Sequence, residues 1–254
     1  MPVDLRSKRA AFRKLHEAGC FVLPNPWDLG SLRRLERRGF AALATTSSGA
    51  AWAVGREDGE LSRNEVLSHM RMMCEATELP VNADFEAGFA DSAEGVAANV
   101  ALAVGTGVAG VSIEDRVGRE LYELPLAGDR IRAAREAIDR SGEDVLLVGR
   151  SEGFLVGRTE LAATIERLIA YAEAGADCLY APGIREVSDV AAVVAAVAPK
   201  PVNVLLLSGM RVADLAAAGV RRVSVGGALA AAAWAGFDRV VRQLVDEGTV
   251  PPRG

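Results

Sequence analysis

The sequence of 254 residues is poor in the side chains that many enzymes use as nucleophiles and bases. It has two histidines, His16 and His69, and three lysines, Lys8, Lys14 and Lys200. A Schiff-base aldolase needs a lysine at the end of a barrel strand, but Lys8 and Lys14 fall in the first predicted helix and Lys200 precedes a strand. Both histidines fall in helical patterns, which favours surface or capping positions. The sequence therefore argues against lysine and histidine catalysis.

Clustered cysteines, long apolar runs and an excess of positive charge are missing too. The three cysteines lie far apart and form no metal-type spacing, so we expect small buried side chains at Cys20, Cys74 and Cys178. No apolar run reaches the ~18 residues of a membrane-spanning helix, and the N-terminus has no signal-peptide pattern. The formal charge is −5. We therefore expect a cytoplasmic protein that binds neither nucleic acid nor membrane.

The chain does show short apolar or β-branched runs that alternate with amphipathic helical stretches. Eight runs are predicted strands: 21–23, 41–45, 81–85, 110–114, 145–149, 178–181, 202–206 and 222–225. Helical patterns between them include 64–77, 93–104, 127–141, 160–174 and 187–197. Near-continuous apolar strands separated by helices indicate parallel pairing with both faces covered. The pattern predicts the α/β class and a (β/α)8 TIM barrel, as one domain over residues 1–254.

The segment after the first predicted strand makes an open nucleotide-binding sheet the weaker alternative. That segment is Pro-Asn-Pro-Trp-Asp at 24–28, where a dinucleotide fold would carry a glycine-rich fingerprint. Several helical patterns end at a glycine, such as Gly19 and Gly175, which supplies the left-handed conformation that stops a helix.

Acidic residues gather at the ends of the middle strands, where a barrel places its active site. Asp84 and Glu86 are two residues apart, so an extended strand would point both into the barrel mouth. Glu114 ends the next strand and can join them. Three carboxylates this close repel one another unless a cation lies between them, and Mg²⁺ or Mn²⁺ prefers such oxygen ligands. The sequence therefore predicts a metal site, with solvated surface charges as the alternative.

Other polar residues at strand ends suit an anionic ligand. Arg150 can clamp a carboxylate or phosphonate with its two-pronged guanidinium, or form an internal salt bridge to Glu114 or Glu152, or do both. The segment of Ser47, Ser48 and Gly49 offers hydroxyl and N–H groups, although a plain turn explains it nearly as well. A glycine pair before the last predicted helix suits a phosphate cradle: Gly226 and Gly227.

Taken together, these strand ends resemble the isocitrate lyase/phosphoenolpyruvate mutase superfamily over nearly the whole chain. The segments that carry the likeness are 46–49, 55–58, 82–88, 111–115, 149–152, 201–204 and 226–229. The resemblance implies a Mg²⁺-dependent barrel that makes or breaks C–C or P–C bonds beside a keto-acid carboxylate. It also implies a homodimer or homotetramer, often with exchange of the last helix.

The resemblance implies a role for each matching residue. Asp84 would bind the metal directly, and three further carboxylates would hold its water ligands: Asp58, Glu86 and Glu114. The substrate carboxylate would lie against Ser47, Ser48, Gly49, Arg150, Asn203, Gly226 and Gly227. Arg150, with Glu114 and Asp58, would act on the enolate that forms. Gly153 stands where many relatives have an asparagine.

One loop departs from the lyases of the superfamily. After the fourth predicted strand they carry a Lys-Cys-Gly-His loop with an acidic cysteine, whereas the short segment 117–124 here has neither Cys nor His. The gating loop of the mutase is missing too. The short-loop members include oxaloacetate decarboxylase-like proteins. In this segment Glu120 and Glu123 either lie at the mouth of the site or are solvated charges.

Three functions remain open from sequence. The first is a C–C lyase or decarboxylase that acts on a small 2-oxo or 2-hydroxy carboxylic acid through an enolate. The second is a phosphonopyruvate-type P–C mutase or hydrolase, disfavoured because an open site would not keep water from the intermediate. The third is a metal and keto-acid binding protein with little turnover.

Overall fold

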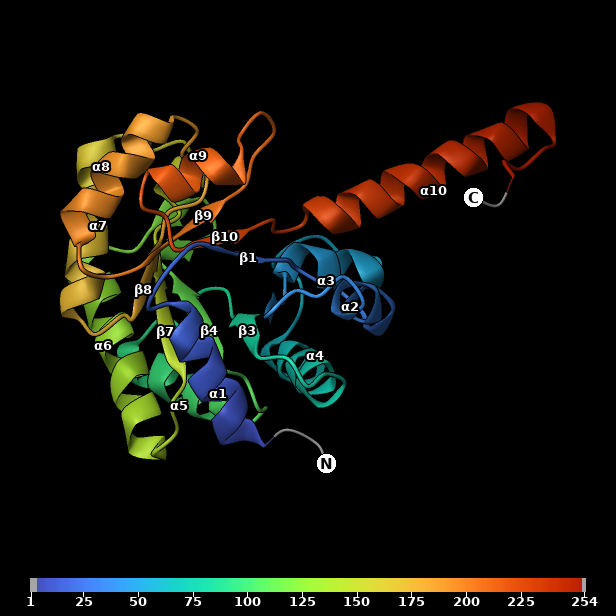
Figure 1. Cartoon of the computed structure of the whole chain (residues 1–254). Helices are drawn as coiled ribbons and strands as arrows, with labels where there is room; N and C mark the ends of the chain where they lie inside the picture. Colours follow the sequence, from blue (N-terminus) through green and yellow to red (C-terminus); the bar gives the residue numbers. More distant parts are fainter. Residues whose placement is uncertain (1–3, 253–254) are drawn as a thin grey trace.

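The computed structural model describes residues 4–252, in which eight parallel strands form one sheet curled into a nearly closed barrel (Figure 1). The strands are β1 (Phe21–Leu23), β2 (Leu43–Ala44), β3 (Val81–Asp84), β4 (Gly110–Glu114), β7 (Leu146–Arg150), β8 (Cys178–Tyr180), β9 (Val202–Leu205) and β10 (Arg222–Ser224). They follow the order β1-β10-β9-β8-β7-β4-β3-β2. The Ala44 N–H donates to the Pro24 carbonyl at 3.0 Å and links the first two strand ends.

Helices surround the barrel. They are α1 (Leu5–Leu15), α2 (Leu29–Glu36), α3 (Ser47–Ala53), α4 (Arg63–Glu75), α5 (Ala93–Val104), α6 (Leu124–Ser141), α7 (Leu161–Glu173), α8 (Val187–Val197), α9 (Val212–Ala217) and α10 (Ala228–Glu247). A hairpin of β5 (Arg116–Val117) and β6 (Glu120–Leu121) follows β4, and the short helix η1 (Gly153–Val156) follows β7. The predicted (β/α)8 barrel is confirmed. The ends of the predicted domain, 1–3 and 253–254, lie outside the described residues.

The predicted elements differ from the observed ones mainly at the segment after β2. The second strand was expected at 41–45 and has two residues, and the turn expected at 47–49 is the start of α3. Strands 21–23 and 110–114 and helices 93–104 and 187–197 have their predicted bounds. Gly19 and Gly175 have positive φ angles of 74° and 104°, as expected for glycines that follow a helix.

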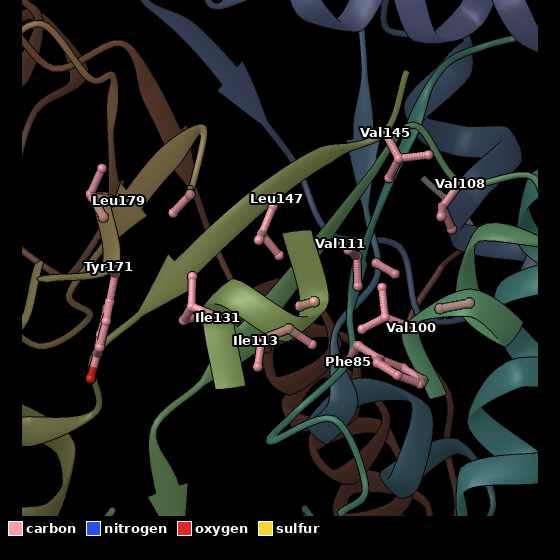
Figure 2. Packing of buried hydrophobic residues seen from close by; sticks show 14 of the residues in the cluster. Phe85, Val100, Val108, Val111, Ile113, Ile131, Val145, Leu147, Tyr171 and Leu179 are labelled. Carbon is pink, nitrogen blue, oxygen red and sulfur yellow. The ribbon is translucent and has the colours of Figure 1, made fainter. Parts of the chain in front are cut away.

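Apolar side chains between the sheet and its helices form the main core (Figure 2). Val111 and Ile113 of β4 and Leu147 of β7 are fully buried there, with Val100 of α5 packed against the same cluster. Continuous apolar strands are stable because helices cover the outer face of the sheet. Of the cysteines, Cys74 and Cys178 are buried as expected, whereas Cys20 is half-buried.

One register row crosses five neighbouring strands with polar or aromatic residues. Glu114 pairs with Arg150, Arg150 with Tyr180, Tyr180 with Asn203, and Asn203 with Arg222. Arg222 begins β10, whereas Arg150 and Glu114 end β7 and β4. Because barrel strands tilt and are staggered, such a row climbs from one end of the barrel toward the other. It connects the barrel interior with the mouth.

His16 caps α1, as its position in the sequence predicted, but it is buried and not at the surface. Its Nδ1 lies 2.8 Å from the Phe12 carbonyl, and its Nε2 lies 3.4 Å from Nη1 of Arg222. Burial, followed by the charge of Arg222, lowers the pKa of His16 to about 3. The imidazole is therefore neutral at pH 7. His69 of α4 is also partly buried, with Nε2 at 2.9 Å from the Trp27 carbonyl.

The neutral His16 makes stability dependent on pH. In the unfolded chain His16 takes up a proton near its ordinary pKa of 6.5, whereas in the folded protein it resists protonation until about pH 3. Stability is therefore lost as the pH falls from 6.5 toward 3. We expect a loss of about 2 kcal/mol between pH 7.5 and pH 5 from this residue alone. Urea unfolding at both pH values should show a smaller decrease for His16→Gln than for the unsubstituted protein; equal decreases would contradict the assignment.

Helix α10 extends away from the barrel, coloured red in Figure 1. Ala230 is its one buried residue, and large apolar side chains face outward: Trp234 (40% exposed), Phe237 (59%), Val241, Leu244 and Val245 (77%). Within residues 4–252, no helix is long and apolar enough to cross a membrane.

Candidate active site

The carboxyl ends of the strands surround a cavity of about 180 Å³. A cavity of this size suits a small ligand. Its lining includes these predicted site residues: Ser47, Ser48, Asp58, Asp84, Arg150, Asn203, Gly226 and Gly227. Gly49, Glu86 and Glu114 do not line it.

Arg150 lies between three carboxylates at the end of β7. Its Nη1 is 3.2 Å from Asp84 and 3.3 Å from Glu114, and its Nε is 2.5 Å from Glu152. Burial by itself lowers the pKa of Arg150, but the three carboxylates raise it well above its ordinary value. The internal salt bridge considered from sequence is present, and Arg150 lines the cavity as well.

Glu86 does not lie on the strand that was expected to carry it. Strand β3 ends at Asp84, and Glu86 adopts a left-handed backbone with φ of 48°. Its carboxylate is nevertheless close enough to Asp84 and Asp58 for their charges, after burial, to raise the pKa of Glu86 to about 7. Its buried Oε1 has no hydrogen-bond partner within residues 4–252. Asp84 and Glu86 are therefore close together, as expected, but a turn after β3 and not the strand itself brings Glu86 there.

The chemistry of these groups fits a hard divalent cation. Asp84, Glu86 and Asp58 offer only oxygen donors, and their mutual repulsion would fall if a cation joined them. Glu86 also has a buried oxygen without a partner. No group of three or more His, Cys, Asp or Glu side chains in residues 4–252 is already arranged around a metal position. The fit is therefore one of charge and donor type, and Mg²⁺ stays a prediction.

Glu114 is buried and lies behind Arg150, away from the cavity. Burial raises the pKa of Glu114, while Arg150 opposes that shift. Arg116 at the start of the hairpin lies 3.4 Å from the other Glu114 oxygen. Glu114 is thus held by two guanidinium groups, in place of the direct contact with the cavity expected from sequence.

Helix α3 begins at the predicted carboxylate-binding segment. The Ser47 N–H donates to Asp84 at 3.1 Å, and the hydroxyls of Ser48 and Thr46 lie 3.1 Å apart. Gly49 is buried, and a Cβ there would lie 2.8 Å from the side chains of both Thr46 and Trp27. Gly49 therefore serves close packing and does not reach the cavity. Ser47 and Ser48 remain as candidate ligand contacts.

The glycine pair after β10 is held by Asn25, a residue that sequence reasoning did not select. The Asn25 side chain accepts from the N–H groups of Val225 at 3.0 Å and Gly226 at 2.9 Å, and donates to the Thr45 carbonyl at 2.9 Å. It thereby joins the ends of β1, β2 and β10. Because the Gly226 N–H already has a partner, the pair is less suited to a phosphate cradle than predicted. The sequence feature that could have indicated Asn25 is its position between two prolines directly after a strand.

Further residues of the lining were not predicted, among them Tyr180, Asn82 and Arg222. The guanidinium carbon of Arg150 lies 5.3 Å from the centre of the Tyr180 ring, and burial raises the pKa of Tyr180. Asn203, which was predicted, donates to Ser224 at 3.0 Å and accepts from Arg222 Nε at 3.0 Å. These residues were missed because their side chains point inward from strands, where apolar groups are usual.

Asp115 was not predicted either, and it positions Arg150. This buried carboxylate accepts from the Ser151 hydroxyl at 3.0 Å, the Glu152 N–H at 2.8 Å and the Tyr171 hydroxyl at 2.5 Å. Glu152 in turn pairs with Arg150. Asp115 therefore fixes the backbone from which Arg150 and Glu152 project.

The hairpin after β4 carries no acid into the cavity. Glu120 pairs with Arg158 at the surface, and Glu123 is an exposed residue before α6. Neither lines the cavity. Of the two interpretations, the solvated charge is the correct one for both residues. Gly153, at the start of η1, lies close to Arg158, since a Cβ there would be 3.0 Å from the Arg158 carbonyl.

Comparison with known proteins agrees with this geometry. Residues 12–245 match the family model for phosphoenolpyruvate phosphomutase. The chain belongs to this family. It therefore lies in the isocitrate lyase/phosphoenolpyruvate mutase superfamily, whose members include lyases, decarboxylases and hydrolases.

Three relatives illustrate the range of this phosphoenolpyruvate phosphomutase family. An uncharacterised protein of Mycobacterium tuberculosis is 32% identical over 85% of this chain and 81% of its own. The 2-methylisocitrate lyase of Escherichia coli is 33% identical over 60% of this chain and 54% of its own. An oxaloacetate decarboxylase of Rhodopseudomonas palustris is 30% identical over 75% and 68%.

Solved structures of family members superimpose closely on this fold. A Burkholderia cenocepacia protein, described provisionally as a lyase/mutase, has a TM-score of 0.94 and 44% identity over 97% of this chain and 92% of its own. Oxaloacetate acetylhydrolase in complex with its product oxalate has a TM-score of 0.89 and 27% identity over 97% and 90%.

Proposed function

We propose that the protein is a carbon–carbon lyase or decarboxylase that acts on a small 2-oxo or 2-hydroxy carboxylic acid through an enolate. The observation that carries the proposal is the cavity of about 180 Å³ at the carboxyl ends of the strands, where Asp84 pairs with Arg150 and Asp58 also lines the wall. Oxaloacetate is the substrate named for two of the relatives, a decarboxylase and an acetylhydrolase. The size of the cavity favours such a ligand over a nucleotide or sugar phosphate.

A divalent cation, Mg²⁺ or Mn²⁺, completes the proposed site. Asp84, Glu86 and Asp58 would hold it, as oxygen donors that otherwise repel one another. When bound, the cation supplies positive charge that stabilises the oxygen on which negative charge develops. Arg150 adds a guanidinium at the same end of the cavity, and Ser47 and Ser48 offer hydroxyls to the substrate carboxylate.

Tyr180 is the proton donor in this proposal. Among the described residues that line the cavity there is no histidine, cysteine or lysine, and Tyr180 carries the one phenol. For a 2-oxo dicarboxylate such as oxaloacetate, the bond between C3 and the terminal carboxylate breaks, CO₂ leaves, and the electron pair of that bond forms the enolate of the remaining 2-oxo acid. The enolate carbon then takes the Tyr180 proton, and solvent reprotonates the tyrosinate. Arg150, 5.3 Å from the ring centre, stabilises the transient negative charge.

The test is a screen for pyruvate release with Mg²⁺ present. The candidates are oxaloacetate, methylisocitrate, related 2-hydroxy acids and phosphonopyruvate. We expect release from one carboxylic acid, abolished by EDTA. Release from phosphonopyruvate alone would replace the proposal with P–C chemistry. Absence of product from every compound, with Mg²⁺-dependent binding of oxalate, would leave a binding protein.

Substitution Tyr180→Phe is expected to lower kcat by 10²- to 10³-fold, since general acid catalysis contributes about that much. The phenyl ring keeps its contact with Arg150, so calorimetry should give an unchanged affinity for oxalate. Asn82→Ala serves as a control on the lining, with a smaller effect on kcat. A Tyr180→Phe protein with kcat within twofold of the original would remove Tyr180 from the mechanism.

We also propose that the protein forms a homodimer or homotetramer through α10. An isolated helix with Trp234, Phe237 and Val245 exposed gains stability when a second subunit covers its apolar face. A second copy fits because α10 leaves its own barrel beyond Ala230. The substrate carboxylic acid is the other proposed partner.

Sedimentation equilibrium tests the assembly. We expect the protein to sediment as a dimer or tetramer, and Phe237→Asp to weaken association by at least about 30-fold because it places a charge in an apolar contact. Arg242→Gln, an exposed change on the same helix, should leave the assembly intact. A monomer at all concentrations would contradict the proposal.

A further inference from the structure

Arg222 is a buried cation with no acidic partner. Its side chain is in the barrel interior and the residue is 2% exposed. No carboxylate forms an ion pair with it within residues 4–252, whereas Arg150 in the same register row has three. Burial of an unpaired charge strongly opposes folding. An unpaired arginine at this position therefore indicates a role in binding and not in stability.

The neighbours of Arg222 are neutral. Nε donates to the Asn203 side-chain oxygen at 3.0 Å, and Nη1 lies 3.4 Å from both Asn82 Oδ1 and His16 Nε2. His16 stays uncharged because burial and Arg222 lower its pKa to about 3. These three groups orient the guanidinium and satisfy part of its hydrogen bonding. None of them neutralises its charge, because an amide oxygen and an uncharged imidazole carry no formal charge.

Arg222 also reaches the cavity. It lines the same space as Asp84 and Arg150, although it stands at the start of its strand and they stand at the end. The register row explains this, because the tilt of the strands carries it from Arg150 through Tyr180 and Asn203 down to Arg222. Small side chains such as Ala44 and Ser112 line the wall and leave the interior open. The cavity thus has a guanidinium at its mouth and another at its base.

We propose that Arg222 binds a second anionic group of the substrate, so that the site selects compact dicarboxylates over monocarboxylates. This inference rests on the proposed function, in which the first carboxylate lies at the mouth near Arg150, Ser47 and Ser48. A carboxylate at the base would give Arg222 the counter-charge that the chain does not provide. Asn203 and Asn82 are positioning residues, since they hold the guanidinium from opposite strands.

Paired ligands separate this role from a structural one. L-Malate and L-lactate share the 2-hydroxy acid and differ in the second carboxylate. We expect calorimetry in Mg²⁺ buffer to give at least about tenfold tighter binding of malate. Arg222→Gln should weaken malate by about 30-fold and leave lactate within twofold. Arg222→Lys, which keeps the charge, should retain part of the preference for malate.

Arg221→Gln is the matched control, because this neighbour donates to the Gly19 carbonyl at 2.5 Å and does not line the cavity. Equal affinity of the unsubstituted protein for both ligands, or absence of malate binding, would overturn the inference. An equal loss of affinity for both ligands in Arg222→Gln would also overturn it, because such a loss indicates general disruption of the site. Unchanged malate affinity in Arg222→Gln would overturn it as well. Failure of the proposed function has another signature: both ligands bind equally well in EDTA and no compound of the screen is turned over.

Discussion

Asp84→Asn is expected to lower kcat/KM by about 10³-fold, because it removes the negative charge that draws a cation to the site. The fold should persist. An asparagine oxygen can still accept from the Ser47 N–H, and Arg150 keeps Glu114 and Glu152 as partners. The comparison needs turnover, Mg²⁺ or Mn²⁺ affinity by calorimetry, and urea unfolding of the same preparations. We expect the metal affinity to fall with the turnover.

Asp129→Asn is the control for this substitution. Asp129 is exposed on α6, where it pairs with Arg132, and its loss should leave turnover and metal affinity unchanged. Near-normal turnover in Asp84→Asn would refute the site assignment. Loss of turnover with intact metal binding would move the metal to other ligands and leave Asp84 a role toward Arg150.

The barrel could be predicted because its strands repeat one local pattern. Runs such as 146–148 are apolar at every position and buried, and a helical pattern follows the strand, so parallel pairing with both faces covered could be predicted from local sequence. Segment 43–53 was harder. Two strand residues lead directly into α3, whose small residues Ala50 and Ala51 carry little helical periodicity but pack into the barrel. The formation of α3 therefore depends on its packing against the barrel more than on its local sequence pattern.

The site shows the same division between local and distant causes. Asp84 and Arg150 could be selected because each ends a strand. Glu86 reached the predicted cluster through a left-handed turn that the spacing does not reveal. Arg222 begins its strand, where barrel residues usually serve stability, and only the stagger of the strands brings it to the cavity. Pairings across the barrel are not encoded in any short segment.

Arg150→Ala is expected to remove activity and to destabilise the protein. Arg150 is the shared partner of Asp84, Glu114 and Glu152, and the last two are buried. Its loss leaves Arg116, at 3.4 Å from Glu114 and 3.8 Å from Glu152, as their nearest cation. Unpaired buried carboxylates cost about 3–5 kcal/mol.

The sign of the pH dependence separates this cause from a simple packing defect. Without the guanidinium the folded-state pKa of Glu114, already raised by burial, rises further above its unfolded value. The unfavourable charge is then present at high pH and is neutralised as the pH falls through that pKa. Urea unfolding should therefore show a larger deficit for Arg150→Ala at pH 8 than at pH 5. A deficit independent of pH would point to lost packing against Tyr180.

Arg150→Lys completes the argument because it restores the charge without the planar fork. The ammonium can offset Glu114 or Glu152, so we expect it to recover most of the lost unfolding free energy. It cannot bind two carboxylate oxygens side by side, so kcat/KM should stay about 10²-fold below the original. Stability and turnover would then separate in one variant. Recovery of both would mean that Arg150 acts at the site only as a charge, and the bidentate contact with substrate would be wrong.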